Sequence, residues 1–127
     1  MPNLLYVILD ENGNIVDFYC NFDNLTYNKE EVIGKNWFDT FIDPVDKEKI
    51  WSVFTQILQG HDKEYETYKN DIVCKDGSHR LIDFYNRLVT KDGKKYTFSV
   101  GMEHFEADMR LLKELAKEFY QKSFLNA

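Results

Sequence analysis

Residues 65–104 read YETYKNDIVCKDGSHRLIDFYNRLVTKDGKKYTFSVGMEH, and this stretch decides the fold. Three runs in it are rich in β-branched and aromatic residues: 65–74, 80–90 and 95–104. Asp76-Gly77 separates the first two runs, and Asp92-Gly93 separates the last two. Asp-Gly between such runs is typical of a tight hairpin turn, because that turn needs positive φ angles. The stretch therefore predicts a three-stranded antiparallel meander.

The region before the meander predicts a long helix at residues 44–59. Asp43 is a good N-cap, and Pro44 suits the first helical position because its missing N–H needs no partner there. Gly60 ends the helical pattern. Apolar residues recur at i, i+3, i+4, i+7 and i+8, which is one helical face: Ile50, Val53, Phe54, Ile57 and Leu58. We expect this face to lie across the sheet.

Residues 4–42 predict a hairpin and two short helices. The hairpin joins residues 4–9 to residues 15–20 through a turn that contains Asn12-Gly13. Asn28 then begins a short helix, and Glu31 stands where it can complete a capping box. Gly34 ends this helix after barely two turns. A compact apolar group follows, which predicts another helical turn packed on the core: Trp37, Phe38, Phe41 and Ile42.

From Phe105 onward the apolar residues recur at alternating steps of four and three, which is the spacing of a coiled-coil seam. The series is Phe105, Met109, Leu112, Ala116 and Phe119, and the polar Ser123 continues the same spacing. We expect residues 106–127 to form an amphipathic linker helix with a homodimer seam at Met109, Leu112, Ala116 and Phe119. The alternative is that the same stripe docks back onto its own domain.

The composition and charge fit one globular domain of 127 residues with a net charge of -6. Nucleic-acid binding needs a basic face, whereas the densest basic group lies at a predicted hairpin tip: Lys91, Lys94 and Lys95. No apolar run approaches the roughly 20 residues that span a bilayer. The first residues also lack the basic flank and cleavage site of a signal peptide. We therefore expect a cytoplasmic domain that contacts neither nucleic acid nor membrane.

Four local motifs, together with this order of elements, resemble the PAS domain family over almost the whole chain. They are DENGNI at 10–15, YNKEEVIGK at 27–35, DPVD at 43–46 and KDGS at 75–78. The second is similar to the GY-x-x-EE-x-x-GK segment of the family, and the third matches the start of its long helix. The resemblance rests on the order and spacing of the motifs, because each motif alone is weak.

The resemblance implies an α+β fold: a five-stranded antiparallel sheet in the order 2-1-5-4-3, with helices on one face and a C-terminal signalling helix. It implies a PAS sensor domain at residues 1–105, linked by the helix at 106–127 to an output domain such as a histidine kinase or diguanylate cyclase. Cys20 and Cys74 would lie in opposite edge strands, too far apart for a disulfide. The domain itself is expected to transmit a signal and not to catalyse a reaction.

The resemblance also indicates which cofactors to consider. Haem needs an axial ligand, usually histidine, and residues 44–59 contain none. The flavin thiol adduct of the light-sensing branch needs a cysteine after Gly-x-Asn, but Gly34-Lys35-Asn36 is followed by Trp37. Haem and a flavin photoadduct are therefore disfavoured, and the cofactor stays undefined. No phosphate loop, nucleophile elbow or HExxH pair predicts a catalytic or metal site.

A ligand pocket is expected between the long helix and the sheet, with these candidate residues: Trp37, Phe54, Phe84, Asn86, Phe98 and His104. Alternation along the second meander strand places Asn86 among apolar neighbours, where its amide needs partners from backbone, water or ligand. His104 shares a strand face with Phe98, either as a histidine satisfied by the protein or as a ligand contact. Two functions stay open: a ligand-gated sensor, and a ligand-free dimerisation module with a packed core.

Overall fold

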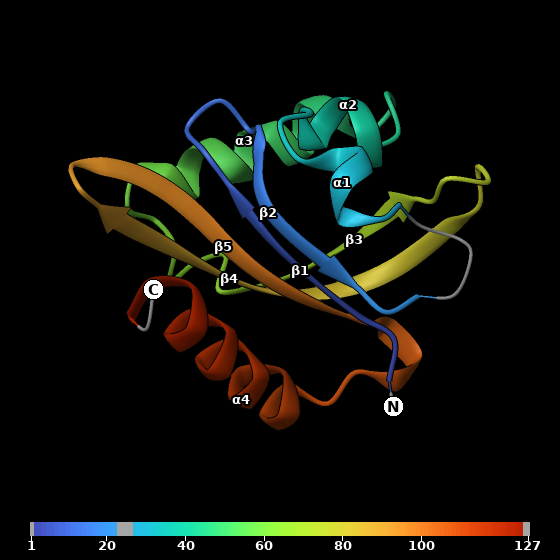
Figure 1. Ribbon diagram of the computed structural model, residues 1–127. Coiled ribbons are helices and arrows are strands. Elements are labelled where there is room, and N and C mark those ends of the chain that lie inside the picture. Colours follow the sequence, from blue (N-terminus) through green and yellow to red (C-terminus); the bar gives the residue numbers. More distant parts are fainter. Residues whose placement is uncertain (1, 23–26, 126–127) are drawn as a thin grey trace.

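The five strands form one antiparallel sheet in the order β2-β1-β5-β4-β3 (Figure 1). The structure is a computed structural model that describes residues 2–22 and 27–125. The strands are β1 Leu4–Leu9, β2 Ile15–Cys20, β3 Thr67–Val73, β4 His79–Lys91 and β5 Lys94–Glu103. The sheet order and the antiparallel meander of β3, β4 and β5 confirm the predicted fold.

The turn between β4 and β5 sets the register of the longest hairpin. Asp92 and Gly93 have φ angles of 53° and 77°, which are the positive values that an Asp-Gly hairpin turn requires. The two strands then pair from Lys91 opposite Lys94 at the turn to Ile82 opposite Glu103 at the far end. This register fixes which side chains of β4 and β5 share a face of the sheet.

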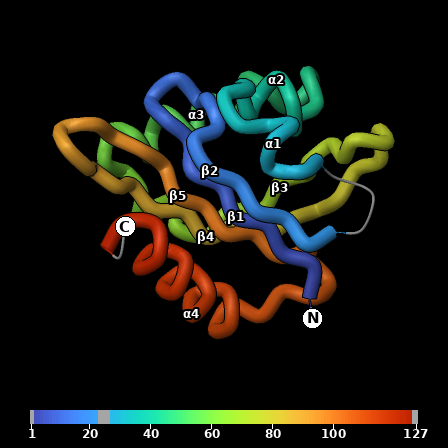
Figure 2. The backbone as a smooth tube through the Cα atoms, viewed as in Figure 1, coloured from blue at the N-terminus to red at the C-terminus, as the bar shows by residue number. Residues whose placement is uncertain are grey.

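Three helices cover one face, here called the inner face (Figures 1 and 2). They are α1 Lys29–Val32, α2 Trp37–Phe41 and α3 Lys47–Leu58. The predicted capping box of α1 is present: the backbone N–H of Asn28 donates to Glu31 Oε2 at 2.8 Å. These helices and the sheet enclose the larger apolar cluster.

Helix α3 begins at Lys47, later than the predicted start at Pro44. Asp43 Oδ1 accepts a hydrogen bond from Val45 N at 2.9 Å, and the Asp43 carbonyl accepts one from Asp46 N at 2.9 Å. The Asp43 side chain is therefore used in a turn, and the helix starts after Asp46. The apolar face of α3 packs on the sheet as predicted, with Phe54 and Ile57 buried.

The C-terminal helix α4, Met109–Tyr120, lies on the opposite, outer face of the sheet (Figure 1). Asp108 caps it, because its Oδ1 accepts hydrogen bonds from the backbone N–H groups of Arg110 at 2.9 Å and Leu111 at 3.2 Å. A turn of π-helix, Gln121–Leu125, extends it. Residues 126–127 of the predicted linker helix lie outside the described residues.

The apolar stripe of α4 packs on the sheet of the same chain. Leu112 and Ala116 are 0% and 3% exposed, and Phe119 stacks on Tyr6 with ring centroids 4.8 Å apart. Met109 is partly exposed at 38%. Within one chain the docking alternative therefore describes the residues at the centre of the stripe, and the homodimer seam stays a prediction. Helices therefore cover both faces of the sheet, and α4 buries its apolar side against the outer face.

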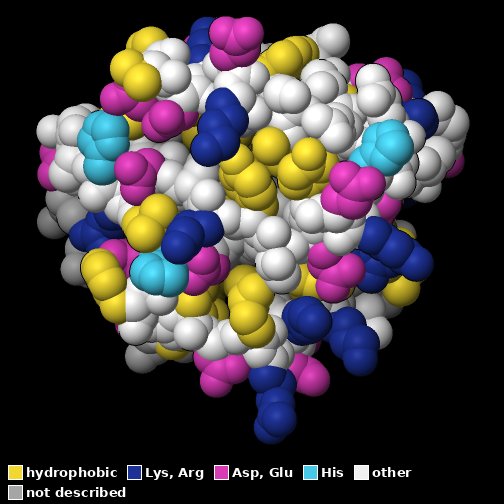
Figure 3. Space-filling view, turned by 180° about the vertical axis from the view of Figure 1, so that it is seen from behind, with side chains coloured by type: hydrophobic (Ala, Val, Ile, Leu, Met, Phe, Trp, Pro, Cys, Tyr) yellow, Lys and Arg dark blue, Asp and Glu magenta, His cyan; other side chains and the backbone are white. Residues whose placement is uncertain are grey.

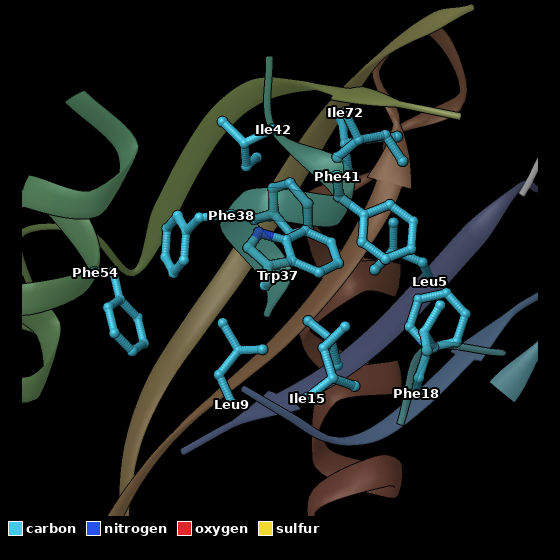
Figure 4. Close-up of a cluster of buried hydrophobic side chains, with 14 of the residues drawn as sticks. Leu5, Leu9, Ile15, Phe18, Trp37, Phe38, Phe41, Ile42, Phe54 and Ile72 are labelled. Carbon is cyan, nitrogen blue, oxygen red and sulfur yellow. The ribbon is translucent and has the colours of Figure 1, made fainter. Parts of the chain in front are cut away.

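The sheet separates two apolar clusters. The inner cluster contains an aromatic group shown in Figure 4: Phe18, Trp37, Phe38, Phe41 and Phe54. The outer cluster lies under α4 and includes Tyr6, Phe98, Val100 and Leu112. All six residues of β1 are buried, because this strand contributes side chains to both clusters. Within the described residues, no helix is both long and apolar enough to cross a membrane.

Candidate functional site

A small cavity lies between α3 and the inner face of the sheet. Its volume is about 50 Å³. A buried water needs roughly 10–15 Å³ of such space, whereas drug-sized ligands occupy pockets of roughly 300–1,000 Å³. In this state the cavity has room for a few waters. The residues that line it are Val7, Leu9, Trp37, Phe38, Ile50, Val53, Phe54, Ile57, Tyr68, Asn70, Phe84, Asn86, Thr97 and Ser99.

Four of the expected pocket residues line this cavity: Trp37, Phe54, Phe84 and Asn86. Trp37 comes from α2 and stacks on Phe41, with ring centroids 4.5 Å apart. It also meets Phe84 of β4 edge-on at 6.4 Å. Figure 4 shows Trp37 in the middle of the aromatic group, with Phe54 on the neighbouring helix. The short helix α2 therefore positions the largest side chain of the cavity wall.

Asn86 is a buried amide in the cavity wall, 7% exposed. Its Nδ2 donates to the backbone carbonyl of Tyr65 at 2.9 Å, and its Oδ1 accepts from Ser99 Oγ at 2.6 Å. The partners that its burial requires are thus a backbone group and a neighbouring side chain. An amide has two N–H donors and two lone pairs on oxygen. Each end of Asn86 can therefore make one more hydrogen bond, which a molecule in the cavity could supply.

The other polar residues of the cavity were not predicted from the sequence. Thr97 and Ser99 come from β5, and Tyr68 and Asn70 come from β3. The strand register brings Ser99 directly opposite Asn86. Once that register is known, Ser99 can be assigned to the cavity from alternation alone. None of the lining side chains carries a formal charge, so the cavity suits an uncharged occupant, because a buried unpaired charge is costly.

Phe98 does not line the cavity, and its expected orientation is wrong. It is fully buried on the outer face, edge-on to Tyr6 at 5.6 Å and to Tyr120 of α4 at 5.9 Å. Side chains do alternate along β5, but the apolar set faces α4. The docked helix gives the outer face a core of its own, which is where the large residues of β5 are buried.

The inner face of β5 carries small residues because large neighbours fill the space beside it. A Cβ atom at Gly101 would lie 2.5 Å from Ile82 Cγ2 and 2.8 Å from a ring carbon of Phe84. Real Cβ atoms essentially never approach so closely, so any side chain at this position would displace β4 side chains. Farther along the same face, Thr97 and Ser99 leave room for the cavity.

His104 also lies away from the cavity. It begins a 3-10 turn, His104–Glu106, that follows β5, and its side chain is 45% exposed. Its Nδ1 lies 2.8 Å from Asp83 Oδ2 on β4. Because β5 ends at Glu103, His104 leaves the strand face that it was expected to share with Phe98. The hydrogen-bond partner of His104 is therefore the Asp83 side chain, and the pair lies at the surface.

Among residues 2–22 and 27–125, no group of three or more His, Cys, Asp or Glu side chains could hold a metal ion. Burial raises the pKa of the Cys74 thiol, which disfavours the reactive thiolate at neutral pH.

The sheet order, the helices on its inner face and the cavity between them define the PAS class of sensory and signalling domains. Residues 3–111 match the PAS domain family, and the chain belongs to that family. This confirms the resemblance seen in the motifs. The comparison with curated proteins gave no match.

Three solved structures show what the chain is similar to. The PAS domain of the quorum-sensing receptor RpfR from Cronobacter turicensis, in complex with BDSF, is 27% identical, with 81% of this chain and 95% of that chain covered and a TM-score of 0.55. The Cycle PAS-B domain of Drosophila melanogaster, with bound ethylene glycol, is 12% identical, with 76% and 96% covered and a TM-score of 0.59. A PAS domain of an HTR-like protein from Haloarcula marismortui is 19% identical, with 80% and 81% covered and a TM-score of 0.51. The last two show a shared fold.

Proposed function

We propose that this chain is the sensory PAS domain of a larger signalling protein, and that its inner cavity binds a small uncharged molecule. The observation that carries the proposal is the Asn86 amide, hydrogen-bonded and buried in a wall that is otherwise largely apolar. A ligand with one hydrogen-bonding group would bind Asn86, while its apolar part contacts Trp37 and Phe54. The RpfR domain, in complex with BDSF, supports ligand binding as a use of this fold.

The small volume of the cavity makes binding depend on a change of shape. At about 50 Å³ the cavity cannot hold even a small metabolite, so a ligand must bind a state in which α3 lies farther from the sheet. A ligand that binds one state better than the other shifts the equilibrium between them. Differential affinity of this kind is the physical requirement for a sensor.

The signal would leave the domain through β5 and α4. Ser99 faces the cavity and contacts Asn86, whereas its neighbour Phe98 faces α4. Phe98 meets Tyr120 and Phe124 of the C-terminal helix edge-on, at 5.9 and 6.2 Å. A displacement of β5 at the cavity is therefore transferred directly to the docked helix. An output domain such as a histidine kinase or a diguanylate cyclase would receive it.

Native mass spectrometry of the purified domain, with an absorbance spectrum of the same sample, tests the proposal. We expect a bound small molecule, or saturable binding of 1-hexanol as an uncharged amphipathic probe, seen as a rise in melting temperature. Losing a hydrogen bond to the ligand lowers affinity about tenfold, so Asn86→Leu should weaken binding by that factor. Thr90→Val, on the exposed end of the same strand, is the matched control. Equal affinity of the two variants for 1-hexanol would show that Asn86 does not contact the ligand.

A ligand-free interaction module is the second candidate, and the small cavity favours it. In that case the packed inner cluster would serve stability alone, and the domain would act by associating with another copy. Sedimentation at increasing concentration separates the two functions. An empty protein that dimerises and binds no probe fits the interaction module, whereas a protein whose state changes with ligand fits the sensor.

A further inference from the structure

A surface groove lies next to the cavity, between α3 and the start of β3. Its volume is about 650 Å³, and its lining mixes polar and apolar side chains: Val45, Glu48, Lys49, Ser52, Val53, Gln56, Tyr65 and Tyr68. Figure 3 shows the side of the molecule opposite to Figure 1, where apolar side chains reach the surface near the centre, between charged ones. The groove is much larger than the cavity behind it, and it opens to solvent.

Two residues line both the groove and the cavity: Val53 of α3 and Tyr68 of β3. Both are half-buried, which is what a wall between an interior space and the surface requires. The cavity and the groove therefore adjoin at these two side chains, one from each side of the groove. If these two side chains move apart, the cavity and the groove become one space.

A hydrogen bond holds the two sides of the groove together. Tyr65 Oη donates to Gln56 Oε1 of α3 at 3.2 Å, and the Tyr65 ring meets the Tyr68 ring edge-on at 6.1 Å. The backbone carbonyl of the same Tyr65 accepts from Nδ2 of Asn86 at 2.9 Å. Tyr65 thus connects the amide in the cavity to the helix that covers the cavity.

We propose that this groove is the entrance to the cavity, with Val53 and Tyr68 as the gate and the Tyr65–Gln56 hydrogen bond as its latch. The proposal rests on the proposed ligand-binding function and names the ligand class further: a small uncharged molecule that carries a hydrogen-bond acceptor. Such an acceptor bonds the second N–H of the Asn86 amide, whose other N–H bonds the Tyr65 carbonyl. The ligand is then connected through Asn86 to Tyr65, and through Tyr65 to Gln56 of α3.

Collisional quenching of Trp37 fluorescence measures the entrance without any knowledge of the ligand. The chain has two tryptophans, and Trp51→Phe leaves Trp37 as the remaining fluorophore in the cavity wall. Trp51 is 39% exposed and packs on Phe38, so phenylalanine keeps an aromatic ring at that contact. Acrylamide is the probe, because it is small, neutral and carries an acceptor oxygen.

In the Trp51→Phe background, Tyr68→Ala should raise the quenching rate constant about threefold, because the gate then no longer closes. Tyr65→Phe, which removes only the hydroxyl of the latch, should raise it by a smaller factor. Tyr96→Ala and Tyr96→Phe are the controls, because Tyr96 is a half-buried tyrosine in the outer cluster, and both should leave quenching unchanged. Val53→Ala replaces Tyr68→Ala if that variant does not fold.

Unchanged quenching in folded Tyr68→Ala and Tyr65→Phe variants would overturn the entrance. An equal rise in the Tyr96 variants would do the same, since it would show general loosening. Both results are independent of ligand binding. If the domain binds no 1-hexanol but the gate variants raise quenching, the proposed ligand binding is wrong and the entrance is supported. If the domain binds 1-hexanol and the gate variants leave quenching unchanged, ligand binding is supported and the groove is not the entrance.

Discussion

Tyr6 is the residue at which β1, the edge strand β2 and the C-terminal helix meet. Its side chain is 3% exposed, its ring stacks on Phe119, and its hydroxyl bonds Ser123 at the end of the chain and Asp17 Oδ2 at 3.3 Å. Asp17 in turn pairs with Lys29 of α1 at 2.8 Å. A line of polar contacts therefore runs from the outer helix, around the edge of the sheet, to the inner helices.

Ionisation of Tyr6 should destabilise the fold at high pH. Burial, and secondarily the charge of Asp17, raises the pKa of Tyr6 from 10.0 to about 12. The folded state thus favours the neutral phenol, and this stabilisation is complete below pH 10 and lost as pH rises toward 12. The free energy of unfolding should fall more steeply over this window than in Tyr6→Phe, by at most about 1.4 kcal/mol per pH unit. Urea denaturation of both proteins at several pH values measures the difference, and parallel curves would contradict the prediction.

At the scale of elements, the strands and turns could be predicted from the sequence, because the signals that define them are local. Asp76-Gly77 and Asp92-Gly93 mark the meander without reference to the rest of the fold. The capping box of Asn28 and Glu31 is likewise local, because its two residues are three positions apart in the sequence. The start of α3 was misplaced because Asp43 has two local uses, as a helix cap and in a turn, and the sequence does not distinguish them.

The partner of each apolar face could not be predicted, because periodicity defines a face without saying what covers it. The stripe of α4 fits a second helix or a sheet equally well, and Leu112 is in fact buried on the sheet. The alternation of β5 was clear, yet Phe98 was assigned to the wrong side because the docked helix was not foreseen. Asn86 was assigned correctly to the inner face, where an amide among apolar neighbours is a distinctive signal.

Docking of α4 predicts the effect of a charge at its centre. Leu112 is fully buried against the outer face of the sheet, so Leu112→Glu places a carboxylate in an apolar contact and should detach the helix. Hydrogen exchange should then show lost protection in α4, while β4 and β5 stay protected. Lys117→Glu, on the exposed side of the same helix, is the control and should leave α4 protected. Retained protection of α4 in Leu112→Glu would contradict the docked arrangement.

At the scale of the whole molecule, a largely buried ion pair lies where β1 begins and β5 ends. Arg80 of β4 pairs with Glu103 at the end of β5, and their side chains are 18% and 7% exposed. Asn3 Nδ2 also donates to Glu103 Oε1 at 2.6 Å, and the Asn3 carbonyl accepts from Glu103 N at 3.0 Å. The start of β1 and the exit from β5 are thus held at one point, where the chain leaves the sheet toward α4.

Breaking this pair from one side should cost more than neutralising both partners. Arg80→Met leaves the Glu103 carboxylate buried without its cation, and we expect a loss of about 3 kcal/mol in the free energy of unfolding. The double variant Arg80→Met/Glu103→Gln removes that charge while an amide can still accept from Asn3, so part of the loss should be recovered. The exposed pair of Lys47 with Asp39 is the control, where Lys47→Met should change stability by less than about 1 kcal/mol. Urea denaturation of all four proteins completes the comparison. A double variant less stable than Arg80→Met would contradict this prediction, because it would show that the Glu103 carboxylate stabilises the junction even without Arg80.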